Sequence, residues 1–117
     1  MARYLLILND APYGSERSYN GLRLADSLAK RGSHEVRVFL MGDAVMCAKL
    51  GQHTPNGYYN IERMLLPVTR AGGQIGVCGS CLDARGIEAG MLAEGAHRGS
   101  MDELTAWTEW AEQVLVF

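Results

Sequence analysis

Short apolar runs without alternation constrain the fold of this chain most. The first, Tyr-Leu-Leu-Ile-Leu at residues 4–8, ends abruptly at Asn9, Asp10 and Pro12. A strand that is apolar on both faces is typical of a parallel sheet covered by helices on both sides. Comparable runs recur along the chain. The expected strands are residues 3–8, 34–41, the segment ending at Cys78, a brief edge strand within 95–99, and 114–117.

Helical spacing fills the segments between these runs. Ser15 can cap a helix that continues to about Lys30, and Ser100-Met-Asp-Glu103 has the spacing of a capping box that begins a later helix. Further helical segments are expected at residues 42–50, 60–71 and 87–92. Strands and helices alternating in this order predict a three-layer α/β domain with a mostly parallel sheet. A length of 117 residues fits a single domain over residues 1–117.

Charge and hydropathy exclude several classes of protein. A net charge of −2 with scattered Lys and Arg gives no electrostatic basis for binding nucleic acid or an acidic membrane surface. No apolar run approaches the roughly 20 residues that cross a bilayer. The run at residues 4–8 is also too short for a secretion signal, so the expected compartment is the cytoplasm. No G-x-G-x-x-G, Walker or H-E-x-x-H motif supports a nucleotide-binding or metalloprotease function.

The chemical feature of the sequence is Cys78-Gly-Ser-Cys81, where a strand passes through a turn into residues that can start a helix. Ligands of open α/β sheets bind beyond the carboxyl ends of the strands, where loop 9–15 and the turn at 42–43 are also expected. Unpaired N–H groups and the helix dipole favour a thiolate at such a place. An odd number of cysteines in a cytosolic chain favours reduced thiols over structural disulfides. The sequence therefore predicts sulfur chemistry at this pair.

Four interpretations of the Cys78–Cys81 pair compete. A structural zinc site needs four ligands, but only Cys47 and three isolated histidines remain, so we expect no metal and no cofactor. A thioredoxin-type dithiol fits the spacing but lacks the proline that normally follows the motif, since no proline comes after Pro67. Two small buried residues in a strand-turn-helix form the third interpretation. The fourth is a sulfur carrier, in which a thiolate holds sulfane sulfur as a persulfide.

The two cysteines are expected to differ in role. Cys78 is the expected carrier, because it ends the strand and its sulfur can face the N–H groups of the turn. Cys81 is closer to the carboxylate of Asp83, which would oppose its ionisation. Cys81 could instead resolve a loaded Cys78, releasing sulfide and forming a disulfide. Arg85 could add positive charge near the site, whereas Cys47 lies among apolar neighbours and is expected in the core.

Polar residues after the first strand are further candidates. Asn9, Asp10 and Tyr13 could polarise a bound group at the edge of the sheet that carries Cys78. A turn that only connects a strand to a helix explains them nearly as well. A histidine could also act as a base for a cysteine nucleophile, but nothing in the sequence places one beside Cys78.

Four blocks of sequence, in order along nearly the whole chain, carry a family resemblance. They are Asn9-Asp-x-Pro-Tyr-Gly-x-Glu-Arg-x-Tyr-Asn-x-Leu-Arg-Leu-Ala25, Phe39-Leu-Met-Gly-Asp-Ala-Val45, Gly57-Tyr-Tyr-Asn60 and Cys78-Gly-Ser-Cys-Leu-Asp-Ala-Arg-Gly86. Together they resemble the DsrE/DsrF-like proteins, and the YchN-like branch of that family more than its relay subunits. The resemblance implies an α/β/α fold with a five-stranded sheet, assembled into trimers or hexamers.

The resemblance also implies a function. In characterised relatives a cysteine matching Cys78 carries sulfur in intracellular relays. We therefore expect a cytoplasmic sulfur-relay protein that acts as a sulfurtransferase or as a sulfur carrier. Its expected partners are a sulfur donor protein, a sulfur acceptor protein and further copies of itself. Aromatic side chains such as Tyr58 and Tyr59 are compatible with such an interface. The alternative is an oligomeric binding or redox-sensing module whose cysteines are structural.

Overall fold

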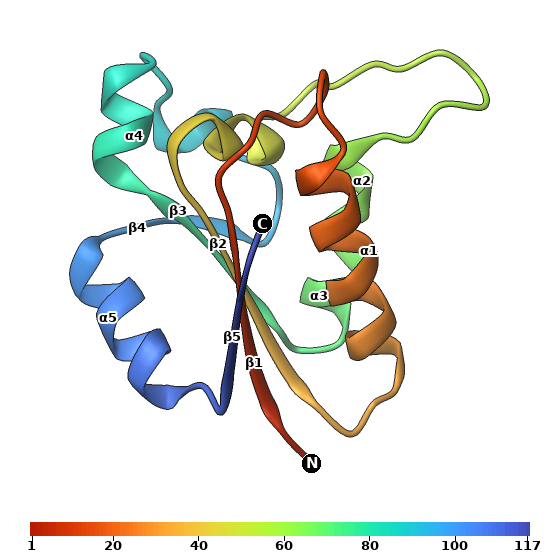
Figure 1. Ribbon diagram of the computed structural model, residues 1–117. Coiled ribbons are helices and arrows are strands. Elements are labelled where there is room, and N and C mark those ends of the chain that lie inside the picture. The colour runs from red at the N-terminus through yellow and green to blue at the C-terminus, as the bar shows by residue number, and fades with distance from the viewer.

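A row of parallel strands forms the centre of the computed structural model, which describes residues 1–117 (Figure 1). Five strands pair in the order β4-β3-β2-β1-β5, and every pairing is parallel. The strands are β1 (Arg3–Leu8), β2 (Glu35–Leu40), β3 (Gln74–Cys78), β4 (Ala96–Gly99) and β5 (Gln113–Val116). The expected parallel sheet is confirmed, and the segment within 95–99 supplies one of its edges.

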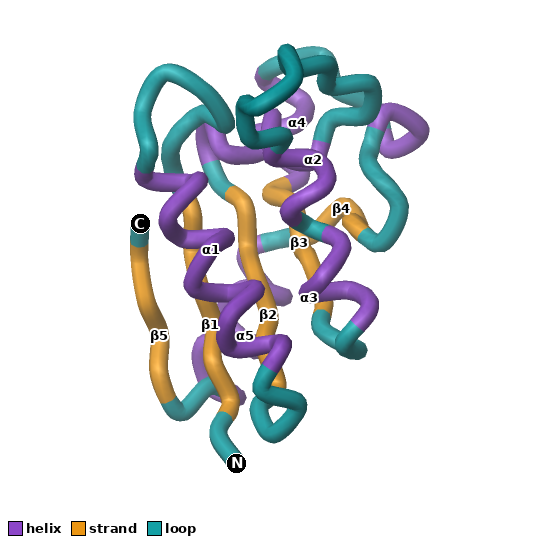
Figure 2. Tube along the Cα trace, turned by 90° about the vertical axis from the view of Figure 1, so that its right-hand side faces the viewer, coloured by secondary structure: helices purple, strands orange, loops and turns teal.

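Helices cover both faces of this sheet. They are α1 (Arg17–Lys30), α2 (Ile61–Met64), α3 (Leu66–Arg70), α4 (Gly79–Ala84) and α5 (Met101–Trp110), with the 3-10 helices η1 (Gly42–Ala48) and η2 (Ala89–Met91). Figure 2 shows α1, α2 and α3 in front of the strands and α5 behind them. The chain moves in one direction from β1 to β4, then returns through α5 to β5 at the opposite edge. The three-layer α/β/α arrangement is therefore confirmed. None of the helices combines the length and the apolar character needed to cross a bilayer.

Two expected helix boundaries were wrong. The first helix begins at Arg17 and its N-cap is Glu16. The hydroxyl of Ser15 donates a hydrogen bond to Asp10 at 2.8 Å and accepts only a long one, 3.5 Å, from the N–H of Arg17. The expected helix at residues 60–71 is two short helices, α2 and α3. Pro67 stands in the first turn of α3, and without an N–H group it cannot continue the hydrogen bonding of the preceding turn.

Two further segments are less regular than expected. Residues 42–48 form a 3-10 helix and not an α-helix, and the expected helix at 87–92 is reduced to the single turn η2. The capping box of α5 is half present. The hydroxyl of Ser100 accepts a hydrogen bond from the N–H of Glu103 at 3.2 Å, but the Glu103 carboxylate binds His97 at 2.8 Å. The expected start of this helix is confirmed.

The sheet register decides which side chains face α5. Ile7 pairs with Phe39, Phe39 with Gly76, and Gly76 with His97, so these four residues form one row across the sheet. The ring of Trp107 in α5 lies edge-on to both Phe39 and His97, with centroid separations of 5.9 and 5.8 Å. This row therefore packs against α5. Strand side chains alternate with a period of two, so Cys78 projects from this same face, beyond the row.

Asp26 gives a test of the packing of α1. One of its carboxylate oxygens is buried without a hydrogen-bond partner, and burial raises the pKa of this group to about 7, against a smaller lowering by Lys30. The folded state therefore keeps a proton that the unfolded chain loses near pH 4. This contribution to stability is full below pH 4 and is lost as the pH rises to about 7.

We expect Asp26→Asn to remove that pH dependence. Above pH 7 the variant should exceed the wild type in free energy of unfolding by about 1–2 kcal/mol, after allowing for solvent screening of a half-buried group. The difference between the two proteins should shrink toward pH 4. Urea unfolding between pH 4 and 8 measures it, and a difference that is constant across this range contradicts the assignment.

Candidate functional site

Cys78 lies at the point where β3 becomes α4. The strand is buried from Ile75 to Cys78, and it pairs with β2 on one side and β4 on the other. Gly79 then begins α4 directly, so no loop separates the thiol from the helix. The Cys78 residue is 8% exposed, which leaves a narrow approach to the sulfur. As expected for an open α/β sheet, the pair lies at the carboxyl edge of the strands, where β3 continues into α4 (Figure 1).

Hydrogen bonds around Cys78 favour its thiolate. Burial by itself would raise the pKa of this thiol. Hydrogen bonds from the side chains of Cys81 and Ser80, and from the backbone N–H groups of the same two residues, outweigh burial and leave the pKa below its ordinary value. The Sγ of Cys78 lies 3.4 Å from the hydroxyl oxygen of Ser80. The sequence therefore places four donors around one sulfur within the span of a single turn.

Cys81 has the opposite tendency. Burial, the hydrogen bond that its S–H donates to Cys78 and the negative charge on Cys78 all raise the pKa of Cys81. The N–H of Gly42, whose φ of 55° suits glycine, donates to its Sγ at 3.2 Å and lowers the pKa in part. The sequence analysis attributed the higher pKa of Cys81 to the carboxylate of Asp83, and this attribution was wrong. That carboxylate points to Arg98, to which it is joined by two contacts of 2.9 Å.

Arg85 lies where the sequence suggested, beside Cys81. One of its N–H groups donates to the Cys81 carbonyl at 3.1 Å, and the guanidinium binds Asp43 of η1 at 2.7 Å. The structure adds Arg98, which sequence analysis missed. Val77 pairs with Arg98 and Cys78 with Gly99, so β4 brings this arginine next to the site. The sequence indicated only that Arg98 lies in the expected edge strand. It did not indicate which residues of β3 pair with that strand.

The polar candidates of the first loop make their contacts elsewhere. The side chain of Asn9 donates to the Phe117 carbonyl at 3.3 Å, and Asp10 accepts a hydrogen bond from Ser15. The hydroxyl of Tyr13 donates to Gln52 at 2.7 Å and accepts from the N–H of Ile61 at 3.0 Å, so it fixes the loop that precedes α2. The structure thus brings together Cys78, Cys81 and Arg85, whereas the side chains of Asn9, Asp10 and Tyr13 hold neighbouring segments.

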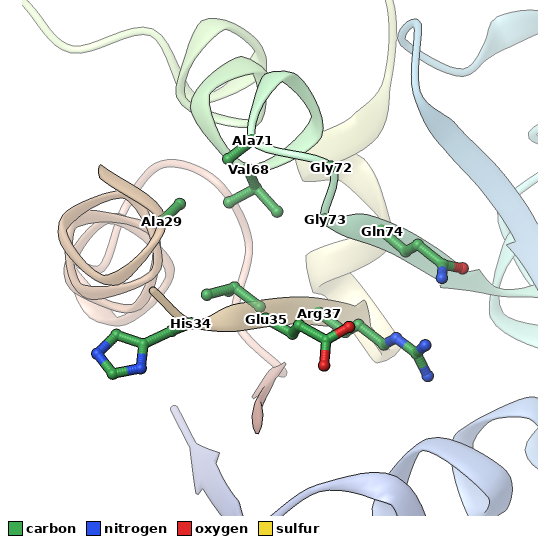
Figure 3. A pocket seen from close by; sticks show the side chains of 10 residues that line it. Ala29, His34, Glu35, Arg37, Val68, Ala71, Gly72, Gly73 and Gln74 are labelled. Atoms are coloured by element: carbon green, nitrogen blue, oxygen red, sulfur yellow. The ribbon is translucent and has the colours of Figure 1, made fainter. Parts of the chain in front are cut away.

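The remaining thiol and the cavities lie apart from this pair. Cys47 is completely buried, and burial raises its pKa to about 12, as suits a core residue. No three His, Cys, Asp or Glu side chains are grouped as ligands of a metal ion would be. A cavity of about 180 Å³ lies at the amino ends of β2 and β3, lined by His34, Glu35 and Gln74 among others (Figure 3). That is the opposite end of the sheet from the cysteines, so the candidate site is a surface around α4.

Known proteins match this chain over its full length. The family model of the DsrE/DsrF-like family matches residues 2–117. Protein YchN of Escherichia coli K12 is 41% identical over 118 residues, covering 100% of both chains. The protein MJ0989 of Methanocaldococcus jannaschii is 35% identical, covering 98% of this chain and 99% of its own.

Solved structures agree with the sequence matches. The crystal structure of the E. coli YchN protein superposes with a TM-score of 0.92 at 39% identity, covering 100% of both chains. MTH1491 from Methanobacterium thermoautotrophicum shares the fold, with a TM-score of 0.73 at 16% identity. The sequence resemblance is confirmed, and the chain belongs to the DsrE/DsrF-like family.

Proposed function

We propose that this protein carries sulfane sulfur as a persulfide on Cys78 and passes it to a thiol of a partner protein. The observation that carries the proposal is the position of Cys78, which ends β3 at the start of α4 with its Sγ 3.4 Å from the Ser80 hydroxyl. The pKa of Cys78 is lowered there while that of Cys81 is raised. A carrier needs one thiolate as the nucleophile, and the thiolate fraction of Cys78 is raised by four hydrogen bonds. Membership of the DsrE/DsrF-like family, whose characterised members act in intracellular sulfur relays, supports the same conclusion. Cytoplasm, where thiols stay reduced, suits this chemistry.

Loading and unloading are two displacements at sulfur. The Cys78 thiolate attacks the outer sulfur of a donor persulfide, a new S–S bond forms, and the electron pair of the old bond leaves with the donor thiolate. An acceptor thiolate then attacks the outer sulfur on Cys78, which departs again as a thiolate. Neither step needs an external oxidant or reductant. The approach is from the side of Ser80, which is exposed, and Cys81, which is partly exposed.

Cys81 is placed to resolve a persulfide that finds no acceptor. It lies in the first turn of α4, three residues after Cys78, and a hydrogen bond between the two side chains contributes to both pKa shifts. Attack by Cys81 on the Sγ of a loaded Cys78 forms the Cys78–Cys81 disulfide and releases the outer sulfur as sulfide. The two cysteine sulfurs are oxidised and the sulfane sulfur is reduced, so the electrons balance.

A homo-oligomer is part of the proposal. The sheet face that bears Cys78 is covered by α5 over only part of its area, since Val114 and Val116 of β5 are 39% and 65% exposed. Val116 pairs with Ile7, which is also partly exposed, so these side chains form a continuous apolar surface. Apolar surface of this kind is typical of a subunit interface, and trimers or hexamers are the expected closed assemblies.

A non-catalytic binding or redox-sensing module is the second candidate. The small exposure of Cys78 favours it, because a buried thiol can also act only as a packing residue. The two candidates differ in what the thiol does in solution. A structural cysteine reacts only near an ordinary pKa of about 8.5 or above, and it takes up no sulfur.

The cysteine variants test the carrier directly. After incubation with a sulfane donor, the wild type should show an added sulfur atom by intact mass spectrometry, and Cys78→Ser should show none. Cys81→Ser should keep the adduct and lengthen its lifetime, because the resolving thiol is gone. Cys47→Ser is the matched control and should load like the wild type, since Cys47 is completely buried. Equal adducts on wild type and Cys78→Ser contradict the proposal.

The pH dependence of alkylation tests the order of the thiols. With iodoacetamide, the reaction of Cys78 should reach half of its maximal rate below pH 8.5, while Cys81 should require a higher pH and Cys47 should stay unmodified. Ser80→Ala removes one donor to the Cys78 sulfur, so its pKa should rise and alkylation at pH 7 should slow by roughly two- to fivefold. Peptide mass mapping assigns each site. A profile in which Cys78 and Cys81 titrate together at alkaline pH favours the second candidate.

The proposed interface predicts the effect of a charge on β5. Val116→Lys should dissociate the oligomer, because a buried ammonium at this surface has no partner, while the fold is kept since the residue is 65% exposed in the single chain. Light scattering coupled to size exclusion measures the mass, and circular dichroism checks the fold. Glu109→Lys, on the exposed side of α5, is a control for added charge. An unchanged oligomer in Val116→Lys places the interface elsewhere.

A further inference from the structure

Two arginines flank the cysteine pair, and each is held by an aspartate of another element. Arg85, at the end of α4, binds Asp43 of η1 at 2.7 Å. Arg98, on β4, binds both carboxylate oxygens of Asp83 in α4 at 2.9 Å, the bidentate geometry that fixes a guanidinium most firmly. The first pair joins α4 to η1, and the second joins α4 to β4. Neither arrangement can be inferred from the spacing of the residues in the sequence.

In both ion pairs the arginine side chain is less exposed to water than the aspartate side chain. The side chain of Arg85 is 30% exposed and that of Asp43 is 67% exposed. The corresponding values are 46% for Arg98 and 65% for Asp83. The positive end of each pair is therefore the end nearer to the protein, and the negative end is nearer to water.

Close contacts connect both guanidinium groups to the cysteines. Arg85 donates to the carbonyl of Cys81 at 3.1 Å. Arg98 passes directly over Gly79, the neighbour of Cys78, and a Cβ at that glycine would lie 3.0 Å from the guanidinium carbon. The pKa of Arg98 is raised, chiefly by its hydrogen bonds to Asp83 and in smaller part by the negative charge of Cys78. Each guanidinium group therefore lies close to the backbone of the cysteine segment, Arg85 at Cys81 and Arg98 at Gly79.

We propose that Arg98 and Arg85 make the site selective for small anionic sulfur donors, in which the sulfane sulfur is bonded to an anionic leaving group. This inference rests on the proposed persulfide function and names its substrate class. A guanidinium attracts the donor and stabilises the charge that grows on the leaving group as the bond breaks. Exposed donor groups remain on both arginines, because each uses only part of its five N–H groups on its aspartate.

Thiosulfate is the simplest probe of this class. The Cys78 thiolate attacks its outer sulfur, a bond forms between the two sulfur atoms, and the bond to the sulfonate sulfur breaks. The electron pair leaves with sulfite. A thiolate and a thiosulfate dianion become a persulfide anion and a sulfite dianion, so charge and electrons balance with no further reactant.

Two alkylating reagents measure the field at Cys78 without any sulfur transfer. Iodoacetate is an anion and iodoacetamide is neutral, so the ratio of their rates at one thiol reports local charge, while the reactivity of the thiol itself cancels. Arg98→Gln should lower the ratio by about three- to tenfold, as expected when a unit charge near the thiol is removed in a largely aqueous surrounding. Asp83→Asn should raise the ratio, because it exposes the charge of Arg98. Partial unfolding cannot produce shifts of opposite sign.

Arg70→Gln is the matched control, since Arg70 is an exposed arginine at the end of α3. It should leave the ratio unchanged. Loading from thiosulfate, followed by intact mass, should slow in Arg98→Gln at least as much as the iodoacetate rate, because thiosulfate carries two charges. Salt should reduce the difference between Arg98→Gln and the wild type.

The outcomes separate the two levels of the proposal. If the wild type takes up no sulfur from polysulfide or thiosulfate, the carrier function itself is wrong. If polysulfide loads Cys78 but Arg98→Gln and Asp83→Asn leave both the reagent ratio and the thiosulfate rate unchanged, the carrier stands and the selection of anionic donors is wrong. A shift in Arg70→Gln equal to that in Arg98→Gln also overturns the selection, because it would show only an effect of net charge.

Discussion

The pairing of β3 between β2 and β4 is the constraint on which the site depends. Both neighbours satisfy the backbone of β3, so the position of Cys78 at its end is fixed by hydrogen bonds on two sides. The same pairing fixes its direction, because side chains of a strand alternate between the two faces. A slip of one residue would turn Cys78 toward α1 and α3 and would bring Val77 to the face of α5. The buried apolar side chains of Ile75 and Val77 oppose such a slip.

Glycines around Cys78 let charged side chains approach the sheet closely. A Cβ at Gly76 or Gly99 would lie 2.7 or 2.6 Å from a carboxylate oxygen of Glu103, and one at Gly79 would meet Arg98. Glycine weakens a strand, so its use at these positions needs a reason, and close approach supplies one. It also explains the half-formed capping box of α5. The Glu103 carboxylate lies against these glycines and binds His97, so it is not free to return to the backbone of Ser100.

The sequence predicted those parts of the structure that local patterns control. Non-alternating apolar runs correctly indicated parallel strands, and the turn at Cys78 correctly placed the thiols at the carboxyl edge of the sheet. Helix boundaries failed where a side chain had a competing partner, as with Ser15, or where Pro67 interrupted the hydrogen bonding. Contacts between distant segments could not be predicted, because they depend on strand register. The N–H of Gly42 on Cys81 and the bidentate pair of Arg98 with Asp83 both belong to this class.

One hydrogen bond couples the ionisation of the two thiols. The hydrogen bond from the S–H of Cys81 lowers the pKa of Cys78 and raises its own, so Cys78 ionises before Cys81. On the proposed mechanism, loading moves the negative charge from the Sγ of Cys78 to the outer sulfur. The charge that opposed the ionisation of Cys81 is then one bond farther from Sγ, whereas the N–H of Gly42 and the charge of Arg85 continue to favour its thiolate. The resolving thiol therefore becomes a better nucleophile only after there is a persulfide to resolve.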